Sequence, residues 1–225
     1  MSGHSSDAWL EGVYHAKTRD DLIALYDGWA DTYDADMQGI GYVHPAVIAG
    51  LVGRYVPNQS DPVFDAGVGT GTVGKILAIL GYSNLIGVDM SDGMLARATA
   101  RRIYADLRNR VLGEPLDFPD GSMAAIVSTG VFTTGHGPAH AWDELTRITR
   151  AGGHLIFTVG TVVWQESGFA RKFDELCGKG LVEPVETTPV YHPMPYSPTE
   201  SGFTTRAHVY RRLYIDPPPF LRASL

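Results

Sequence analysis

Three glycines alternate directly behind an acid in the stretch Val63–Gly71, which reads Val-Phe-Asp-Ala-Gly-Val-Gly-Thr-Gly. A short apolar run precedes Asp65 and an amphipathic run follows the last glycine, so the pattern predicts a strand, a tight turn and a helix. Because Gly67, Gly69 and Gly71 carry no Cβ, their backbone can adopt a positive φ and approach a ligand closely. The N–H groups that begin the following helix can then face an anionic or polar group. The stretch is therefore a predicted binding site for a nucleoside cofactor.

The glycine pattern alone fits two classes of cofactor. Gly69–Gly74 satisfies the G-x-G-x-x-G dinucleotide fingerprint, and Asp89 lies at about the separation that NAD recognition expects. The carboxylate of Asp65 would repel a pyrophosphate, but it would not repel the ammonium group of S-adenosylmethionine. Asp89 ends the next predicted strand, where its carboxylate can accept both hydroxyls of a ribose. These acids favour S-adenosylmethionine, and an NAD(P)-binding oxidoreductase is the alternative.

The elements that must position this turn follow from the alternation of predicted strands and helices, which indicates an α/β fold with helices on both faces of a mostly parallel sheet. The expected strands cover residues 63–65, 85–89, 110–113, 124–128 and 154–159, and the expected helices cover 72–80, 93–104, 142–149 and 165–177. Two more strands, over 181–190 and 206–214, predict an antiparallel hairpin at the edge of a seven-stranded sheet. This C-terminal hairpin is a further feature that the ordinary dinucleotide fold lacks.

A chain of 225 residues predicts a single domain over 1–225. Within it, residues 1–17 are weakly patterned and are expected to be mobile in part, whereas 18–56 are expected to form helices that cover the site. Residues 60–160 are the expected cofactor-binding core, and 161–225 are expected to supply the substrate side and the edge hairpin.

An aromatic stripe marks the helix expected after Thr18, where Thr18 and Asp21 have the spacing of an N-terminal capping box. Tyr26, Trp29 and Tyr33 continue this stripe at helical intervals. Aromatic rings in such a row either pack as a core face or close over a flat or cationic ligand as a lid. The sequence leaves both interpretations open.

Several motifs resemble those of the class I S-adenosylmethionine-dependent methyltransferases, over residues 20–160. Asp65–Gly71 resembles the family's first motif and Gly87–Ser91 the motif of its second strand. Phe118–Ser122 resembles the turn before its fourth strand, and Ala151–Gly153 resembles its Pro-Gly-Gly turn, with alanine where proline is common. Tyr26–Asp34 is similar to the N-terminal helix of a subgroup of small methyltransferases. The resemblance implies a Rossmann-like fold, S-adenosylmethionine as cofactor and S-adenosylhomocysteine as product.

The resemblance also implies a role for individual residues around the cofactor. The glycines would pass under its methionine part, Asp89 would hold the ribose, Glu114 is a candidate for the adenine amino group, and Thr129 would border the transferred methyl. Glu114 is equally well explained as a solvated loop acid. The full expected set is Tyr26, Trp29, Tyr33, Asp65, Gly67, Gly69, Gly71, Asp89, Met90, Glu114, Leu116, Thr129 and Gly130.

The acceptor side is expected in the loop after the fourth strand and in the Pro-rich, aromatic stretch Val190–Phe203. His136, in that loop, is the candidate general base for an acceptor hydroxyl or thiol, and an exposed or capping histidine is the alternative. The expected substrate-binding residues are His44, Phe132, His136, Tyr191, His192 and Tyr196. Their aromatic character favours a small, partly apolar acceptor that receives the methyl by in-line displacement; a module that binds the cofactor without turnover is a further alternative.

Composition excludes several other classes. A formal net charge of −7 argues against non-specific nucleic-acid binding. The single Cys177 excludes an intrachain disulfide and, with no signal-peptide pattern and no apolar run of membrane-spanning length, predicts a cytoplasmic protein. His136 and His140 are four residues apart, but Gly137 and Pro138 interrupt a regular helix between them, so no metal site is expected. The oligomeric state is left open, a dimer included.

Overall fold

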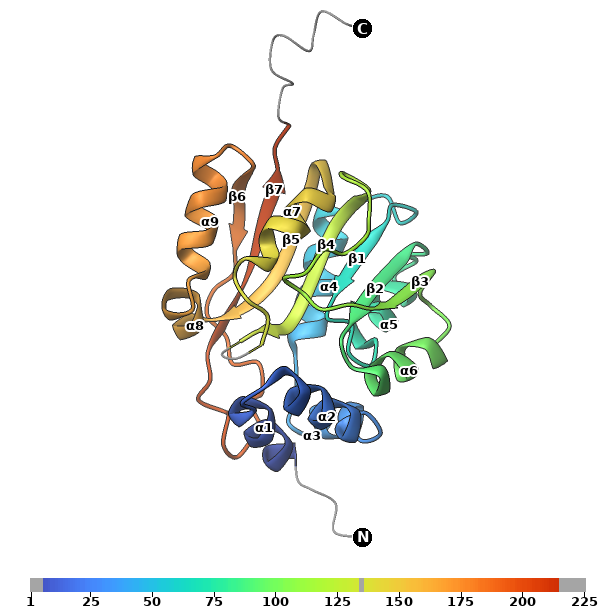
Figure 1. Ribbon diagram of the computed structural model, residues 1–225, viewed down its shortest axis with the longest axis vertical. Helices are drawn as coiled ribbons and strands as arrows, with labels where there is room; N and C mark the ends of the chain where they lie inside the picture. Colours follow the sequence, from blue (N-terminus) through green and yellow to red (C-terminus); the bar gives the residue numbers. More distant parts are fainter. Residues whose placement is uncertain (1–5, 134–135, 215–225) are drawn as a thin grey trace, which may run out of the picture.

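The computed structural model describes residues 6–133 and 136–214 and contains a seven-stranded sheet with strand order β3-β2-β1-β4-β5-β7-β6 (Figure 1). The strands are β1 (Val63–Ala66), β2 (Leu85–Asp89), β3 (Asp106–Asn109), β4 (Met123–Phe132), β5 (Thr149–Gly160), β6 (Val182–Thr187) and β7 (Thr205–Arg212). Strands β1 to β5 are parallel, and β7 is antiparallel to both β5 and β6. The predicted seven-stranded α/β fold with an antiparallel C-terminal hairpin is confirmed.

Helices cover both faces of this sheet and one of its ends (Figure 1). Those described are α1 (Ser6–His15), α2 (Arg19–Trp29), α3 (Tyr33–Gly39), α4 (His44–Tyr55), α5 (Thr72–Ile79), α6 (Asp92–Ala100), α7 (Ala141–Ile148), α8 (Thr161–Glu166) and α9 (Phe169–Gly178). Helices α1, α2 and α3 form the layer across the end of the sheet. None of the helices in this part of the chain is long and apolar enough to cross a membrane.

Two cores form because alternate residues of a strand point to opposite faces. Phe64 of β1 packs with residues of α7 and α9, whereas its neighbour Val63 packs with residues of α4 and α5. Ile126 and Ala125 of β4 divide in the same way. A third core lies within the layer of α1, α2 and α3 and is centred on the buried Trp29.

Strand β3 begins earlier than the sequence predicted, at Asp106 rather than near Arg110. Helix α6 ends at Ala100, because Arg102 has a positive φ of 56° that closes the helix after one more residue. The chain therefore reaches the edge of β2 sooner, where Asp106 to Asn109 pair in register with Ile86 to Asp89. Residues 110–113 are left as a loop beyond the strand.

Three other boundaries also differ from the predicted ones. The aromatic stripe is divided between two helices, because α2 ends at Trp29 and Tyr33 begins α3. The helix expected over 165–177 is broken at Gly168, whose φ is 81°, into α8 and α9. Residues 6–15, where the sequence predicted no element, form helix α1.

Candidate functional site

A cavity of about 440 Å³ lies at the carboxyl ends of the parallel strands, where β1 and β4 are adjacent. The strand order reverses between these two strands, which is where open α/β sheets bind their ligands. The strand side of the cavity is lined by Gly67, Gly69, Val88, Asp89, Met90, Met94, Arg110, Val111, Leu112, Gly113, Glu114, Thr129, Gly130 and Val131. The opposite side is lined by residues 16–19, Leu22, Tyr26, Tyr33, His136, Gly137, Pro138 and His140.

The glycine turn runs beneath this cavity in the strained conformation that its sequence predicts. Gly67, Gly69 and Gly71 have φ values of 82°, 53° and 85°. A Cβ on Gly67 would lie 2.2 Å from the Cγ2 atom of Val131, whereas a Cβ on Gly69 would meet no atom within 4 Å. Gly69 therefore leaves open space for a ligand, and Gly67 permits close packing against β4. Gly71 does not line the cavity and instead caps helix α5.

Asp89 is tied to the glycine turn by hydrogen bonds. The backbone N–H of Gly69 donates to its Oδ2 atom at 2.8 Å, and the N–H of Ser91 donates to Oδ1 at 3.0 Å. Burial raises the pKa of this carboxyl, and the two backbone donors work in the opposite direction. The lone pairs that remain on the carboxylate are available to two hydroxyls in the cavity.

Asp65 supports the turn from behind and does not line the cavity. Its side chain is buried, and the hydroxyl of Tyr104 donates to its Oδ2 atom at 2.7 Å. A Cβ on Gly74 would lie 2.2 Å from that hydroxyl, so the tyrosine fills the space between Asp65 and helix α5. Burial raises the pKa of Asp65 to about 7, although the Tyr104 hydrogen bond lowers it.

This buried carboxyl is expected to make stability depend on pH. Between its ordinary pKa of 3.8 and about 7, the folded protein holds a proton that the unfolded chain releases, so the free energy of unfolding falls as pH rises through this window. Asp65→Asn should flatten that part of the profile and raise the free energy of unfolding at pH 8. Urea unfolding between pH 5 and 8 measures it, with the exposed Asp174→Asn as control. Equal slopes in the wild type and Asp65→Asn would count against the buried carboxyl as the cause.

The aromatic stripe contains residues of both kinds that the sequence left open: some cover the cavity as a lid would, and one packs in a core. Tyr26 and Tyr33 line the cavity, as a lid would. Trp29 does not: it is 1% exposed, stacks between Trp9 and Tyr26, and donates its indole N–H to Asp36 at 2.7 Å. Trp29 therefore belongs to the core between helices α1, α2 and α3 and does not line the cavity.

Two aspartates of helices α2 and α3, which lie off the aromatic stripe, hold these helices against the glycine turn and α6. The sequence analysis did not predict this role. Asp27 of α2 accepts a hydrogen bond from the Ser91 hydroxyl at 2.5 Å. Asp34 of α3 accepts one from the Thr70 hydroxyl at 2.5 Å and pairs with Arg101. Their positions off the aromatic stripe were the available signal, because polar residues at helical intervals mark a second face.

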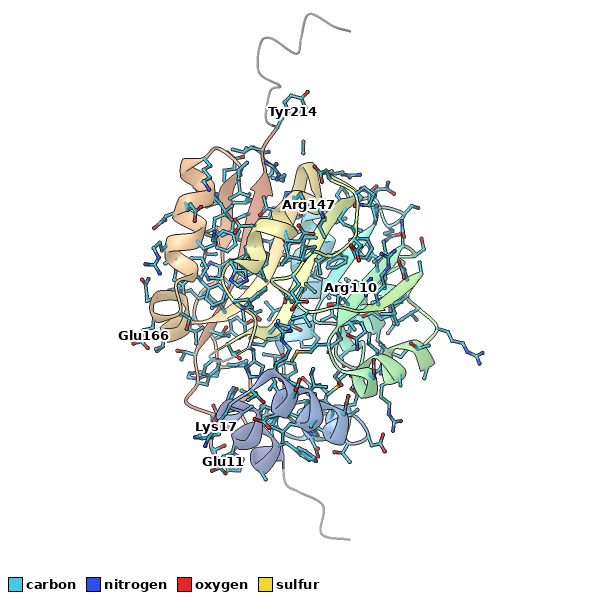
Figure 2. The ribbon with its side chains drawn as sticks, in the orientation of Figure 1. Glu11, Lys17, Arg110, Arg147, Glu166 and Tyr214 are labelled. Atoms are coloured by element: carbon cyan, nitrogen blue, oxygen red, sulfur yellow. The ribbon has the colours of Figure 1, made fainter. Side chains whose placement is uncertain are left out.

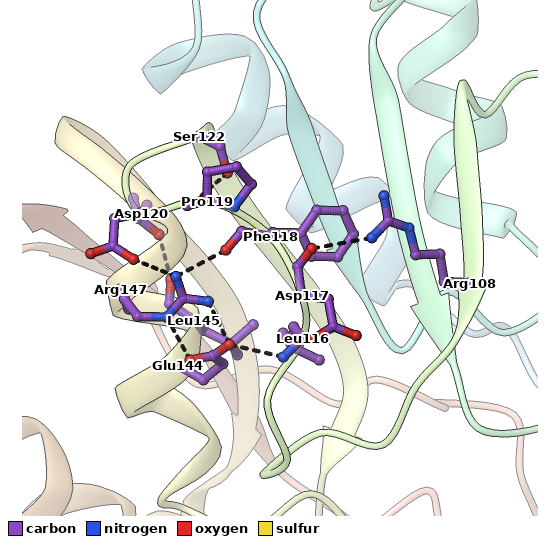
Figure 3. Close-up of polar contacts among 11 residues, drawn as sticks. Arg108, Leu116, Asp117, Phe118, Pro119, Asp120, Ser122, Glu144, Leu145 and Arg147 are labelled. Atoms are coloured by element: carbon purple, nitrogen blue, oxygen red, sulfur yellow. Dashed lines mark hydrogen bonds and ion pairs between the residues drawn. The ribbon is translucent and has the colours of Figure 1, made fainter.

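The loop between β3 and β4 is anchored outside the cavity by an ion-pair network (Figure 3). Arg147 pairs with Glu144 and Asp120 and donates to the carbonyl of Phe118. Glu144 in turn accepts the backbone N–H of Leu116 at 2.9 Å. Leu116 is 1% exposed and lies in the core, so the structure does not place it in the cavity as predicted.

Glu114 lies at the rim of the cavity, on the side that faces the N-terminal helices. Its carboxylate pairs with Arg19 at 2.8 Å, and both side chains are about half exposed. An exposed pair of this kind contributes little stability, roughly 0–1 kcal/mol, so the carboxylate can exchange Arg19 for another partner. Figure 2 shows Lys17 among the N-terminal helices and Arg110 on the strand side.

The end of the cavity at β4 is enclosed by hydroxyls and aromatic rings. Thr129 and Gly130 line it, and a Cβ on Gly130 would lie 2.6 Å from the hydroxyl of Tyr42. Burial raises the pKa of Tyr42 well above its ordinary value, so its phenol stays neutral. Tyr42 is a residue that the sequence analysis missed, because nothing in the local pattern brings residue 42 to the end of β4.

His136 also lines this end of the cavity, between two hydroxyl groups. Its Nε2 atom lies 3.2 Å from the hydroxyl of Tyr26, and its Nδ1 atom lies 2.9 Å from that of Thr133. Residues 134 and 135, in the same loop, lie outside the described part of the chain.

The other residues predicted for the acceptor side do not line this cavity. Phe132 is fully buried in the core against Trp142 and Phe157. His44 is buried and pairs with Tyr191, with 2.7 Å between Nδ1 and the hydroxyl. Two others remain near the surface: the ring of His192 contacts the Phe203 carbonyl, and Tyr196 is 76% exposed. The wrong placement of Phe132 follows from strand β4, which continues to this residue instead of ending at 128.

The charges around the glycine turn distinguish the two classes of cofactor. The Gly69 N–H, which a pyrophosphate would need, is already donated to the Asp89 carboxylate. The nearby Arg101 is paired with Asp34 and donates to the carbonyl of Thr70. An anionic ligand group at the turn would therefore meet the Asp89 carboxylate, and the guanidinium of Arg101 is already engaged. The site fits a nucleoside whose polar end is cationic or neutral.

Fold and site together define an α/β protein with a cavity at its strand ends that fits a nucleoside, and comparisons with known proteins agree. The family model described as "Methyltransferase domain" matches residues 64–157. The human Methyltransferase-like protein 27 is 35% identical over 142 residues, which cover 62% of this chain and 58% of that protein. The chain thus matches little more than half the length of this relative.

Solved structures also share the fold, and two of them illustrate it. The [4+2]-cyclase SpnF has a TM-score of 0.70 at 15% identity, covering 89% of this chain and 98% of that one. A geranyl diphosphate methyltransferase in complex with S-adenosylmethionine has a TM-score of 0.59 at 14% identity, covering 90% and 95%. The family match over residues 64–157 and the similarity to the human relative support a class I S-adenosylmethionine-dependent methyltransferase.

Proposed function

We propose that this protein transfers a methyl group from S-adenosylmethionine to a small-molecule acceptor by in-line displacement. The observation that carries the proposal is one cavity in which the glycine turn, the Asp89 carboxylate and the segment 110–114 follow one another along the strand ends. When bound, S-adenosylmethionine supplies an electrophilic methyl group on a sulfonium sulfur. The chain itself would hold the cofactor, align the acceptor and exclude water.

Each part of the cavity suits one part of this cofactor. Gly67 and Gly69 would pass beneath the methionine moiety, Asp89 would accept the ribose hydroxyls, and Met90 would pack on the adenine. Glu114 would accept the adenine amino group by releasing Arg19. The match between a cationic sulfonium cofactor and a turn that offers a carboxylate supports this assignment over NAD(P).

The acceptor would enter at the β4 end of the cavity, beside Thr129 and Gly130. Tyr26 and Tyr33 line the cavity and Tyr42 lies against Gly130, and burial raises the pKa of all three phenols. They can donate and accept hydrogen bonds but do not ionise at neutral pH, so none of them serves as a general base. His136 is the group there that can take a proton from an acceptor hydroxyl or thiol.

His136→Ala is therefore expected to lower turnover while leaving the affinity for S-adenosylhomocysteine unchanged. A general base contributes about 10²- to 10⁴-fold to a rate. The loss should be largest for an acceptor whose hydroxyl or thiol has a high pKa, because such a group depends most on a base to remove its proton. Titration calorimetry and the rate–pH profile measure the two quantities, with His15→Ala, which changes an exposed histidine outside the cavity, as the control. Full activity of His136→Ala at every pH would exclude it as the base.

The first experiment for the function as a whole is a thermal-shift comparison. S-adenosylhomocysteine should raise the melting temperature and NAD(P) should not. A metabolite extract incubated with methyl-labelled cofactor then identifies the acceptor from the labelled product. Stabilisation by NAD(P) alone would overturn the proposal in favour of an oxidoreductase.

A second candidate is a protein that binds the cofactor without transferring its methyl group. The observation that favours it is the likeness to a [4+2]-cyclase, since the same fold there carries a different chemistry. Tight binding of S-adenosylmethionine without any labelled product across the extract would support this candidate.

The single cysteine of the chain supports our further proposal that the protein acts in the cytoplasm.

A further inference from the structure

A second cavity, of about 410 Å³, lies between helix α8 and the strands of the C-terminal hairpin. It is lined chiefly by Trp164, Gln165, Thr187, Arg206, His208 and Tyr210. It shares no lining residue with the cavity at the strand ends. The cavity lies beside α8, on the left of Figure 1, and on the side of β5 that is away from β1 and β4. It is therefore separate from the site proposed for methyl transfer.

Arg206 brings an uncompensated positive charge to this cavity. Most arginines in the described chain pair with a carboxylate, as Arg211 does with Glu183. Arg206 instead donates one N–H to the carbonyl of Thr188 at 2.9 Å and has no carboxylate partner within the described residues. The chain has 25 aspartates and glutamates and 18 lysines and arginines. A shortage of carboxylates therefore does not explain why Arg206 lacks an acidic partner.

His208, two residues along β7, brings an imidazole ring to the same cavity. The side chain is 5% exposed, and its Nδ1 atom lies 3.3 Å from the hydroxyl of Thr187. Its Nε2 atom has no hydrogen-bond partner in the described part of the chain. This nitrogen therefore remains available for a hydrogen bond with a ligand in the cavity. Burial and the charge of Arg206 lower the pKa of His208 to about 4, so the ring is neutral at pH 7 and Arg206 is the cation of the site.

Aromatic rings form one wall of the cavity. Trp164 stacks on His208, with 4.2 Å between ring centroids and 11° between planes. Tyr210 follows on the same face of β7 and lies close to Phe173 of α9. The indole lies at the cavity surface and is held in a fixed orientation by this stacking. A flat ring placed against it would gain apolar burial without disturbing the core.

We propose that this cavity binds a small organic anion, in which a carboxylate or phosphate group is attached to a planar ring. The guanidinium of Arg206 would hold the anionic group through its remaining N–H donors, a geometry that suits carboxylate and phosphate alike. The Nε2 atom of His208 would add a hydrogen bond to the anionic group. The planar ring of the ligand would lie against Trp164. The proposal goes beyond methyl transfer and does not depend on it.

The test is titration calorimetry of the full chain with 1-naphthoate, 1-naphthyl phosphate and the neutral 1-naphthamide, each with and without S-adenosylhomocysteine. At least one anion should bind with 1:1 stoichiometry whether or not S-adenosylhomocysteine is present, and the amide should bind at least tenfold more weakly. Preference between the two anions identifies the anionic group. Absence of binding by both anions, or equal binding of the amide, would overturn the proposal.

Variants place the binding at this cavity. Arg206→Gln should weaken anion binding at least tenfold, and Trp164→Leu should weaken the binding of the aromatic anions. Arg171→Gln, which removes an exposed arginine from helix α9, is the matched control and should leave binding unchanged. Thermal melting confirms that each variant is folded. Unchanged affinity in a folded Arg206→Gln protein would show that the anion binds elsewhere and would refute the site.

Discussion

Asp89→Ala is expected to weaken the binding of S-adenosylmethionine and S-adenosylhomocysteine by about ten- to a hundredfold. A charge-assisted hydrogen bond is worth roughly 1.5–3 kcal/mol, and the Asp89 carboxylate would make such bonds with the ribose. The variant also releases the Gly69 N–H, which now donates to this carboxylate at 2.8 Å. Both changes act on the glycine turn, so the effect should be on affinity more than on global stability. Titration calorimetry with S-adenosylhomocysteine measures it.

The matched control for this variant is Asp92→Ala. Asp92 lies three residues further on, at the start of helix α6, and accepts a hydrogen bond from Asn109 outside the cavity. The same change of residue type should leave the affinity within about twofold, because a surface interaction of this kind is worth well under 1 kcal/mol. An Asp89→Ala protein that binds S-adenosylhomocysteine as tightly as wild type would falsify the ribose assignment.

Gly67→Ala is expected to destabilise the folded protein by about 2–5 kcal/mol. The residue has a φ of 82°, and its new Cβ would lie 2.2 Å from the Cγ2 atom of Val131 on strand β4. The turn or the strand must therefore move. For a chain of this size the melting temperature should fall by roughly 5–15 °C. Differential scanning calorimetry measures the change.

Two further variants separate backbone strain from collision. Gly69→Ala places a Cβ in open space, so it should cost only the strain of a positive φ, about 1–2 kcal/mol, while the new methyl intrudes on the bound cofactor. In Gly67→Ala/Val131→Ala the collision is relieved, and the double variant should lose less stability than the sum of the two single changes. Strict additivity would mean that contact with Val131 is not what excludes a side chain at residue 67.

Much of the cofactor side could be predicted because its signals are local. An apolar run, an acid and alternating glycines define β1, the turn and α5 within twenty residues, and β2 ends at Asp89 as expected. Backbone geometry at these glycines depends on the absence of a Cβ, which is a property of the residue itself. The antiparallel hairpin was equally predictable, since two β-rich segments at the end of an α/β chain can pair at one edge of the sheet.

Side-chain positions that depend on remote contacts could not be predicted in this way. Trp29 shares a helical stripe with Tyr26, yet one packs inside the lid and the other lines the cavity, because Trp9 and Asp36 hold the indole. Phe132 follows strand four in the sequence pattern but lies in the core, since β4 continues as far as β5 can pair with it.

The sequence by itself determined the order of strands and helices, the glycine turn and the acids that follow β1 and β2, because hydrophobic period and residue type act over short distances. Only the tertiary structure decided which polar groups meet. It brought Tyr42 to Gly130, Asp34 to the glycine turn, and Asp65 to Tyr104 behind the turn. It also placed Arg206 and His208 in a second cavity. These contacts join residues far apart along the chain, and their geometry follows from how the helices pack on the sheet, which local patterns do not specify.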